Sequence, residues 1–253
     1  MSRQPTVRSE GVYNSVSGVY VHDSPYGIWE SSERILDIGP HGPTGRADDP
    51  PSRTIYRGTD LQRAREYVAT GNTAHIATAK PGDFHKHSSA QQAAYYTFNE
   101  AYADQCAQKN PGTGAVIQQR VPSSLLDSGY HFPTEPSSDW RTTVLHNRAQ
   151  QSTPRDPRAV AQSRQKDATT GPIADVHTKG LLSATRKNPS GPAYADAFKP
   201  AIEPRSSTGA SGIDEHRRGP EWAQQIRLQG PALQAVAGCA RSARAAKAPE
   251  RRR

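Results

Sequence analysis

The chain has 253 residues, a formal net charge of +8 and a hydrophobic share of only 33%. Its mean hydropathy of -0.83 predicts that part of the chain forms a packed core and that other parts are disordered. No stretch approaches the roughly 18 apolar residues of a membrane-spanning helix, and no signal peptide opens the chain. These features exclude a helical membrane protein and favour a cytoplasmic location, with unconventional export left open.

The positive charge is concentrated at the C-terminal end. The last thirteen residues contain six basic residues and one acidic residue. Residues 238–253 are therefore predicted to form a basic tail. Such a tail is a solvated chain end or a weak, salt-sensitive contact with nucleic acid or an anionic membrane.

Residues 1–53 are rich in Ser, Gly and Pro and predict an N-terminal segment that precedes the main domain. Short strands are expected at residues 11–13, 19–21 and 26–29. Residues 39–52 (GPHGPTGRADDPPS) have the composition of a linker.

The best-organised region is residues 54–148. A strand at 54–57 leads into a helix at 60–70, because apolar residues recur there at helical spacing and Gly71 follows as a stop signal. The remaining elements are predicted in this order: a helix or turn near 89–94, a helix at about 98–108, a strand at 114–121 and a helix at 140–147. In the last of these, Trp140 and Val144 share one face and are expected in the core.

Beyond this region we expect a strand within residues 167–175, a disordered insertion at about 183–219, a strand at 224–228 and a helix at 231–236. The late strand needs a partner to bury its apolar face, so residues 221–237 are expected to pack against 54–148. The main domain is accordingly predicted to cover residues 54–237.

Four segments that can carry chemistry follow one another along the chain. Residues 55–59 (IYRGT) predict a strand that ends in an Arg-Gly-Thr turn, and residues 83–85 (DFH) precede residues 94–97 (AYYT). The third segment is Trp140 with Asn147 and Arg148 at the end of its helix, and the fourth is residues 224–228 (QQIRL), which precede residues 232–233 (AL). In this order they resemble the ADP-ribosyltransferase superfamily, particularly its small microbial and fungal domains. The resemblance implies an α+β fold in which two small, mostly antiparallel sheets form an NAD-binding cleft.

The resemblance also implies a role for each matching residue. Arg57 and the backbone of Gly58 would hold the ribose or the nicotinamide amide of NAD, and Thr59 would brace the turn. Tyr95 would stack on the nicotinamide ring. In the arginine-specific branch of the family Ser88 would mark the corresponding segment, and the choice between Ser88 and Tyr95 stays open.

The chain departs from the family at the catalytic acid. Gln225 occupies the expected position, and Glu221 lies four residues earlier. An amide can bind a ribose hydroxyl but brings no negative charge to an oxocarbenium-like transition state. A unit charge at ~4 Å in an effective dielectric of ~20 is equivalent to roughly 4 kcal/mol, or about a thousandfold in rate.

The resemblance therefore implies a toxin-like, monomeric protein that uses NAD as a substrate for slow ADP-ribosyl transfer or NAD hydrolysis, with Gln225 or Glu221 at the catalytic position. The acceptor would be a protein or a nucleic acid. One alternative is a non-catalytic interaction module of the same fold. Another is a basic, partly disordered protein that binds nucleic acid.

Histidine and cysteine give no sign of a metal centre. His85 and His87 have a two-residue spacing that suits a strand, but no third ligand follows at a convincing distance. Cys106 and Cys239 form no CxxC or zinc spacing and predict two free thiols or a single disulfide. No metal is predicted.

Overall fold

The computed structural model describes residues 6–31, 33–39, 42–44, 51–78, 82–85, 92–110, 112–149, 158–174 and 223–247. The chain divides into two compact units. The first comprises Met1–Ile76, Ala103–Leu125 and Gln234–Arg253, and the second Ala77–Tyr102 and Leu126–Leu233. Both contain helices and strands, and the strands belong to two sheets with mostly antiparallel pairing. The predicted α+β class is confirmed.

Antiparallel strands make up most of the first unit. One set has the order β1-β5-β6, and a second has the order β7-β9-β13-β4-β3-β2. The strands are β1 (Val7–Glu10), β2 (Val12–Asn14), β3 (Val19–Ser24), β4 (Gly27–Ser31), β5 (Ile35–Gly39), β6 (Gly42–Thr44), β7 (Ser52–Asp60), β9 (Gly114–Pro122) and β13 (Arg241–Ala245).

The N-terminal segment contains more structure than the sequence predicts. The three expected strands are present as β2, β3 and β4, but β1, β5 and β6 are additional. Leu36 and Ile38 alternate along β5 and are buried with Trp29, so this segment has its own small core. The predicted linker at 39–52 is also wrong in part, because β6 and the start of β7 fall within it.

The predicted basic tail at 238–253 begins inside the fold. Strand β13 lies between β9 and β4, so residues 241–245 are part of a sheet. The Nε of Arg241 donates to the carbonyl oxygens of Tyr67 and Val68, both at 3.0 Å. Arg244 makes two hydrogen bonds to the carboxylate of Asp104, at 2.8 and 2.6 Å. These two arginines stabilise the first unit, and residues 248–253 lie outside the described residues.

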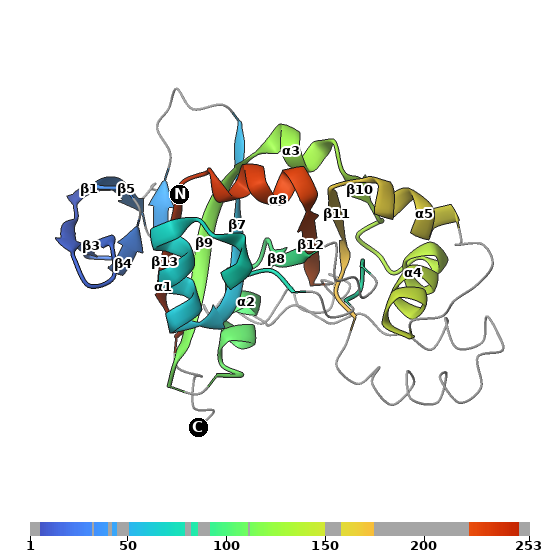
Figure 1. Cartoon of the computed structure of the whole chain (residues 1–253), viewed down its shortest axis with the longest axis horizontal. Helices are drawn as coiled ribbons and strands as arrows, with labels where there is room; N and C mark the ends of the chain where they lie inside the picture. The colour runs from blue at the N-terminus through green and yellow to red at the C-terminus, as the bar shows by residue number, and fades with distance from the viewer. Residues whose placement is uncertain are drawn as a thin grey trace, which may run out of the picture. The chain divides into compact units, whose positions relative to one another are not determined.

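Helix α1 (Leu61–Thr70) confirms the helix predicted at 60–70. It begins where the Asp60 carboxylate accepts a hydrogen bond from the Arg63 N–H. It ends at Gly71, whose φ of 67° is left-handed. The helix packs on β9 and β13 (Figure 1). Tyr67 is fully buried there and donates its hydroxyl to Oε1 of Gln119 at 3.0 Å. A 3-10 helix, η1 (Thr73–His75), follows.

Strand β7 does not end in the predicted Arg-Gly-Thr turn. It runs to Asp60, because β9 supplies pairing partners for Arg57, Gly58 and Thr59 in succession. The backbone groups that face β9 are therefore committed to the sheet. Gly58 instead provides a close approach: a Cβ at this position would lie 2.2 Å from the carbonyl oxygen of Ala103.

We expect Gly58→Ala to destabilise the first unit by about 2–3 kcal/mol, since the added methyl group meets helix backbone that cannot rotate away. Gly238→Ala is the matched control, because its Cβ would meet only an ordinary contact at 3.4 Å. Urea unfolding of both variants measures the difference. Equal, small effects would show that the strand and the helix are not packed as closely as described.

The chain passes from one unit to the other at four positions, of which the first lies between Ile76 and Ala77. The other three lie within the helices α2 (Glu100–Ala107), α3 (Ser123–Asp127) and α8 (Gly230–Ala237). Helices α2 and α8 confirm the helices predicted at 98–108 and 231–236. Within the described residues, no helix is long and apolar enough to cross a membrane.

Among its described residues, the second unit has four strands in the order β10-β11-β12-β8 and the helices α4 and α5. Only β10 and β11 are parallel among these strands. The pairing of β12 with β8 confirms that the late strand returns to the region before residue 148. The elements are β8 (Ala93–Thr97), β10 (Tyr130–His131), α4 (Ser138–Ala149), α5 (Arg158–Gln165), β11 (Ala168–Pro172) and β12 (Gln224–Gln229).

The helix or turn expected near 89–94 overlaps a strand, since β8 begins at Ala93. The alanines of this segment alone favour a helix, but pairing with β12 makes Ala93 and Ala94 part of a strand. The predicted insertion at 183–219 lies outside the described residues.

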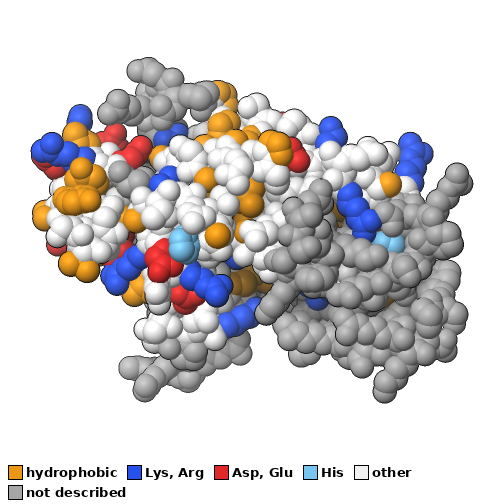
Figure 2. Space-filling model, in the orientation of Figure 1, with side chains coloured by type: hydrophobic (Ala, Val, Ile, Leu, Met, Phe, Trp, Pro, Cys, Tyr) orange, Lys and Arg blue, Asp and Glu red, His pale blue; other side chains and the backbone are white. Residues whose placement is uncertain are grey.

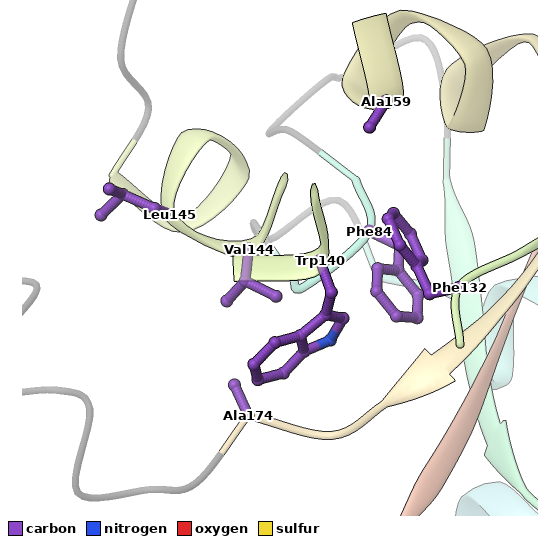
Figure 3. Close-up of a cluster of buried hydrophobic side chains, with 7 residues drawn as sticks. All are labelled: Phe84, Phe132, Trp140, Val144, Leu145, Ala159 and Ala174. Atoms are coloured by element: carbon purple, nitrogen blue, oxygen red, sulfur yellow. The ribbon is translucent and has the colours of Figure 1, made fainter. Parts of the chain in front are cut away.

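A cluster of buried apolar side chains forms the core between α4, α5 and the ends of β10 and β11 (Figure 3). Trp140 is fully buried, as predicted, and its indole N–H donates to the carbonyl oxygen of Pro172 at 2.8 Å. Phe84 stacks on Phe132 with their ring centroids 5.3 Å apart. This core fixes residues 82–85 in place, and the candidate site is built on them.

Candidate functional site

The second unit brings two of the predicted site residues together. On the paired strands β8 and β12, Tyr95 lies opposite Arg227 and Thr97 lies opposite Gln225. Side chains on one face of a sheet recur every second residue, so Tyr95 and Gln225 project from the same face. Both also bond to residues 83–85, which the sequence placed in the same constellation.

Asp83 is the centre of the hydrogen bonds around Gln225. Its side chain is 1% exposed. One carboxylate oxygen accepts from Nε of Arg148, and the other accepts from Nε2 of Gln225 and from the Ala174 N–H at 3.0 Å. The Asp83 carbonyl oxygen accepts from Nδ2 of Asn147 at 3.0 Å. The carboxylate is thus paired, satisfied and inaccessible to solvent.

The side chain of Gln225 is held in one orientation. The residue is 7% exposed, and its Nε2 donates both to Asp83 and to the carbonyl oxygen of Pro172 at 3.2 Å. Within the described residues, no group donates a hydrogen bond to its Oε1. The amide nitrogen of Gln225 is therefore fixed by two acceptors, and its Oε1 accepts from none of the described residues.

Tyr95 is half-buried, and its hydroxyl is engaged within the unit. The hydroxyl accepts from the Phe84 N–H at 3.1 Å and lies 3.0 Å from Nδ1 of His85. Burial raises the pKa of Tyr95 well above its ordinary value, and the negative charge of Asp83 adds to the effect. The phenol is therefore neutral across the physiological range and serves to hold residues 84 and 85.

Arg227 is the residue of this site that sequence reasoning missed. It is fully buried and donates to the carbonyl oxygens of Phe84 and Ser163, both at 2.9 Å. It also donates to the Lys166 carbonyl oxygen at 2.5 Å and to the Thr169 hydroxyl at 2.7 Å. Burial lowers the pKa of Arg227 to about 10. Two of these carbonyls belong to the C-terminal end of α5, where a cation is favoured.

The first unit contains three of the other predicted NAD-binding residues. Arg57, Gly58 and Thr59 are all half-buried on β7. Burial raises the pKa of the nearby Cys106 thiol, and the charges of Lys109 and Arg57 act in the opposite direction. Because Arg57 and Tyr95 belong to different units, their action on one ligand stays a prediction of the sequence.

Ser88 and Glu221 lie outside the described residues, as does His87. Within the described part of the chain, no group of three or more His, Cys, Asp or Glu side chains is placed to hold a metal ion. Of the pair considered in the sequence, His85 is buried against Tyr95.

A surface groove of about 660 Å³ lies beside α1 in the first unit, and none of the predicted site residues lines it. Val16, Leu61 and Arg65 are among the residues that line it. Arg65 is paired with Glu30 at 2.6 Å, and Asp60 caps the helix. These two charged groups of the groove are thus used within the fold.

Comparisons with protein-family models, with curated proteins and with solved structures give no match. The residues around Gln225 and their chemistry are therefore the basis for a functional proposal.

Proposed function

We propose that the chain is an NAD-binding module of the ADP-ribosyltransferase-like class whose turnover of NAD is slow or absent. The observation that carries this proposal is the fixed amide of Gln225. Its Nε2 is anchored by Asp83 and by the Pro172 carbonyl oxygen, and its Oε1 is left as an acceptor. An acceptor held in advance binds a donor without the entropic cost of ordering a glutamine side chain.

A ribose hydroxyl is the donor that this acceptor suits. The nicotinamide ribose of NAD carries such hydroxyls, and Tyr95 on the neighbouring strand offers an aromatic ring from the same face of the sheet. A neutral hydrogen bond of this kind contributes about 0.5–1.5 kcal/mol to binding. It does not stabilise a developing positive charge as a carboxylate does, so binding is retained while the rate of bond cleavage falls.

Calorimetric titration with two ligands tests the proposal on the unaltered protein. NAD is compared with an analogue that lacks the 2′-hydroxyl of the nicotinamide ribose. We expect NAD to bind about five- to tenfold more tightly than the analogue, with little nicotinamide released over hours.

Gln225→Leu is expected to remove the preference for NAD over the analogue, because it removes the acceptor. Gln224→Leu is its matched control. Gln224 lies on the same strand, and its amide donates to the Thr134 carbonyl oxygen at 3.0 Å. Equal affinity of the unaltered protein for the two ligands would contradict the role of Gln225. Absence of NAD binding up to millimolar concentration would contradict the proposal as a whole and favour an interaction module that does not use NAD.

A further inference from the structure

We infer that Asp83 and Gln225 are a coupled pair, in which only one of the two positions can carry a carboxylate and the other carries an amide that donates to it. In this chain the acid is at position 83 and the amide is at position 225, on β12. Asp83 is then a positioning residue, which acts on a ligand only through the orientation of Gln225. The ligand part of this inference rests on the proposed function, but the coupling of the two side chains does not.

The burial of the pair explains why only one acid fits. Asp83 is 1% exposed at its side chain and Gln225 is 7% exposed, and they share a hydrogen bond. Two carboxylates at this separation and away from water cannot both be ionised. An acid at position 225 is therefore incompatible with the present Asp83, whose charge is already satisfied by Arg148 and the Ala174 N–H.

Exchanging the acid and the amide between positions 83 and 225 restores the pairing of an amide donor with a carboxylate acceptor. In Asp83→Asn combined with Gln225→Glu, the asparagine Nδ2 donates to the introduced carboxylate, and its Oδ1 still accepts from Arg148. Two contacts are not recovered. The Ala174 N–H loses its carboxylate acceptor, and the Pro172 carbonyl oxygen loses the donor that Gln225 supplied. The double variant is therefore more stable than Gln225→Glu alone and less stable than the unaltered protein.

The pH dependence of the single variant follows from the same contacts. The glutamate introduced by Gln225→Glu has a raised pKa in the folded state, because it is buried beside Asp83. A raised pKa of an acid means that the folded state holds the proton more tightly than the unfolded state. The stability is then greatest below the unfolded pKa of glutamate, about 4.3, and decreases as the pH rises through the folded pKa. The deficit against the unaltered protein is therefore larger at pH 7 than at pH 4.5.

The test is a thermal double-mutant cycle at pH 7 and pH 4.5, with Gln224→Glu as the control on the same strand. At pH 7 we expect Gln225→Glu to lower the Tm by roughly 5–10 °C, and Asp83→Asn to restore part of that loss. A double variant that is no more stable than Gln225→Glu would overturn the coupling. A pH-independent effect of Gln225→Glu would overturn it as well.

The rate of nicotinamide release tests the positioning role, because a pair that only stabilises the fold would leave this rate unchanged. The double variant places a carboxylate on β12, so its release rate should exceed that of the unaltered protein by tens- to a thousandfold, the lower values reflecting solvent screening. An unchanged rate in a double variant that binds NAD would overturn the positioning role of Asp83. Failure of every variant to bind NAD would overturn the proposed function and the positioning role together, while the thermal cycle would still decide whether the two side chains are coupled.

Discussion

Arg227→Leu is expected to destabilise the second unit by about 4 kcal/mol or more. Leucine fills part of the volume but removes four hydrogen bonds, to three carbonyl oxygens and one hydroxyl. The Ser163 carbonyl oxygen still accepts from the Thr169 hydroxyl and the Lys166 N–H, and the Lys166 carbonyl oxygen still accepts from Nε2 of Gln229. Each lost hydrogen bond costs about 0.5–1.5 kcal/mol, and a buried group left unsatisfied costs about 1–3 kcal/mol. The largest local effect is expected at the C-terminal end of α5, since Arg227 bonds to the Ser163 and Lys166 carbonyls there.

Two further variants separate the hydrogen bonds of Arg227 from general effects. Arg227→Lys keeps the charge but cannot reach four acceptors with one ammonium group, so its loss should be intermediate. Arg158→Leu deletes a guanidinium group at the exposed start of α5. It should change the free energy of unfolding by less than about 0.5 kcal/mol. Urea unfolding measures all three. If Arg227→Leu were as stable as Arg158→Leu, the buried placement of Arg227 would be wrong.

Asp83→Ala is expected to be the second most damaging change, at about 3–5 kcal/mol. It removes one acceptor from the guanidinium of Arg148, from the amide of Gln225 and from the Ala174 N–H. Removing one partner of a buried, hydrogen-bonded ion pair has this magnitude, because the charge pairing and the hydrogen bonds to the carboxylate are lost together.

Glu135→Ala is the control for Asp83→Ala, since Glu135 is an exposed acid of the same unit. Its removal changes the net charge equally and should have little effect on stability. Chemical denaturation monitored by tryptophan fluorescence suits this pair, because Trp140 lies in the core against which residues 83–85 pack. A loss of less than about 1 kcal/mol for Asp83→Ala would show that the carboxylate is not the centre of the site.

The elements with strong local signals could be predicted from the sequence. Helix α1 has an Asp60 cap at its start and Gly71 at its end, and both are local features that need no tertiary partner. Strand β9 begins with the apolar run Ala115-Val116-Ile117 and ends at Pro122. Such elements are encoded over ten residues or fewer, so a single sequence is sufficient to identify them.

The missed elements depend on partners that are distant in the chain. Strand β13 has the sequence RSARA, which contains no apolar run, and it is stabilised by pairing with β9 and by the bond from Arg244 to Asp104. Strand β5 did carry a signal, since Leu36 and Ile38 alternate with polar positions and are buried. Its short length beside a proline- and glycine-rich stretch concealed it.

The candidate site, too, could be predicted from the sequence only in part. Gln225 and Tyr95 could be selected from the order of motifs, but the hydrogen bonds that both make to residues 83–85 could not be predicted. In the sequence, Ile226 and Leu228 alternate with polar residues as they do in a half-buried strand, and Arg227 lies between them. In the structure all three are buried, since this strand is covered on both faces. Sequence alternation alone cannot distinguish an exposed arginine from one that bonds to buried carbonyls.

Thermal unfolding of the unaltered protein with and without NAD is the most direct test of the central claim, that this chain binds NAD. A ligand present at a hundredfold its dissociation constant stabilises the folded state by about 2.7 kcal/mol. For a chain of this size we expect a rise in Tm of roughly 5–10 °C at saturating NAD, and a smaller rise with the 2′-deoxy analogue. A cooperative transition whose Tm does not change with NAD up to millimolar concentration would contradict the account.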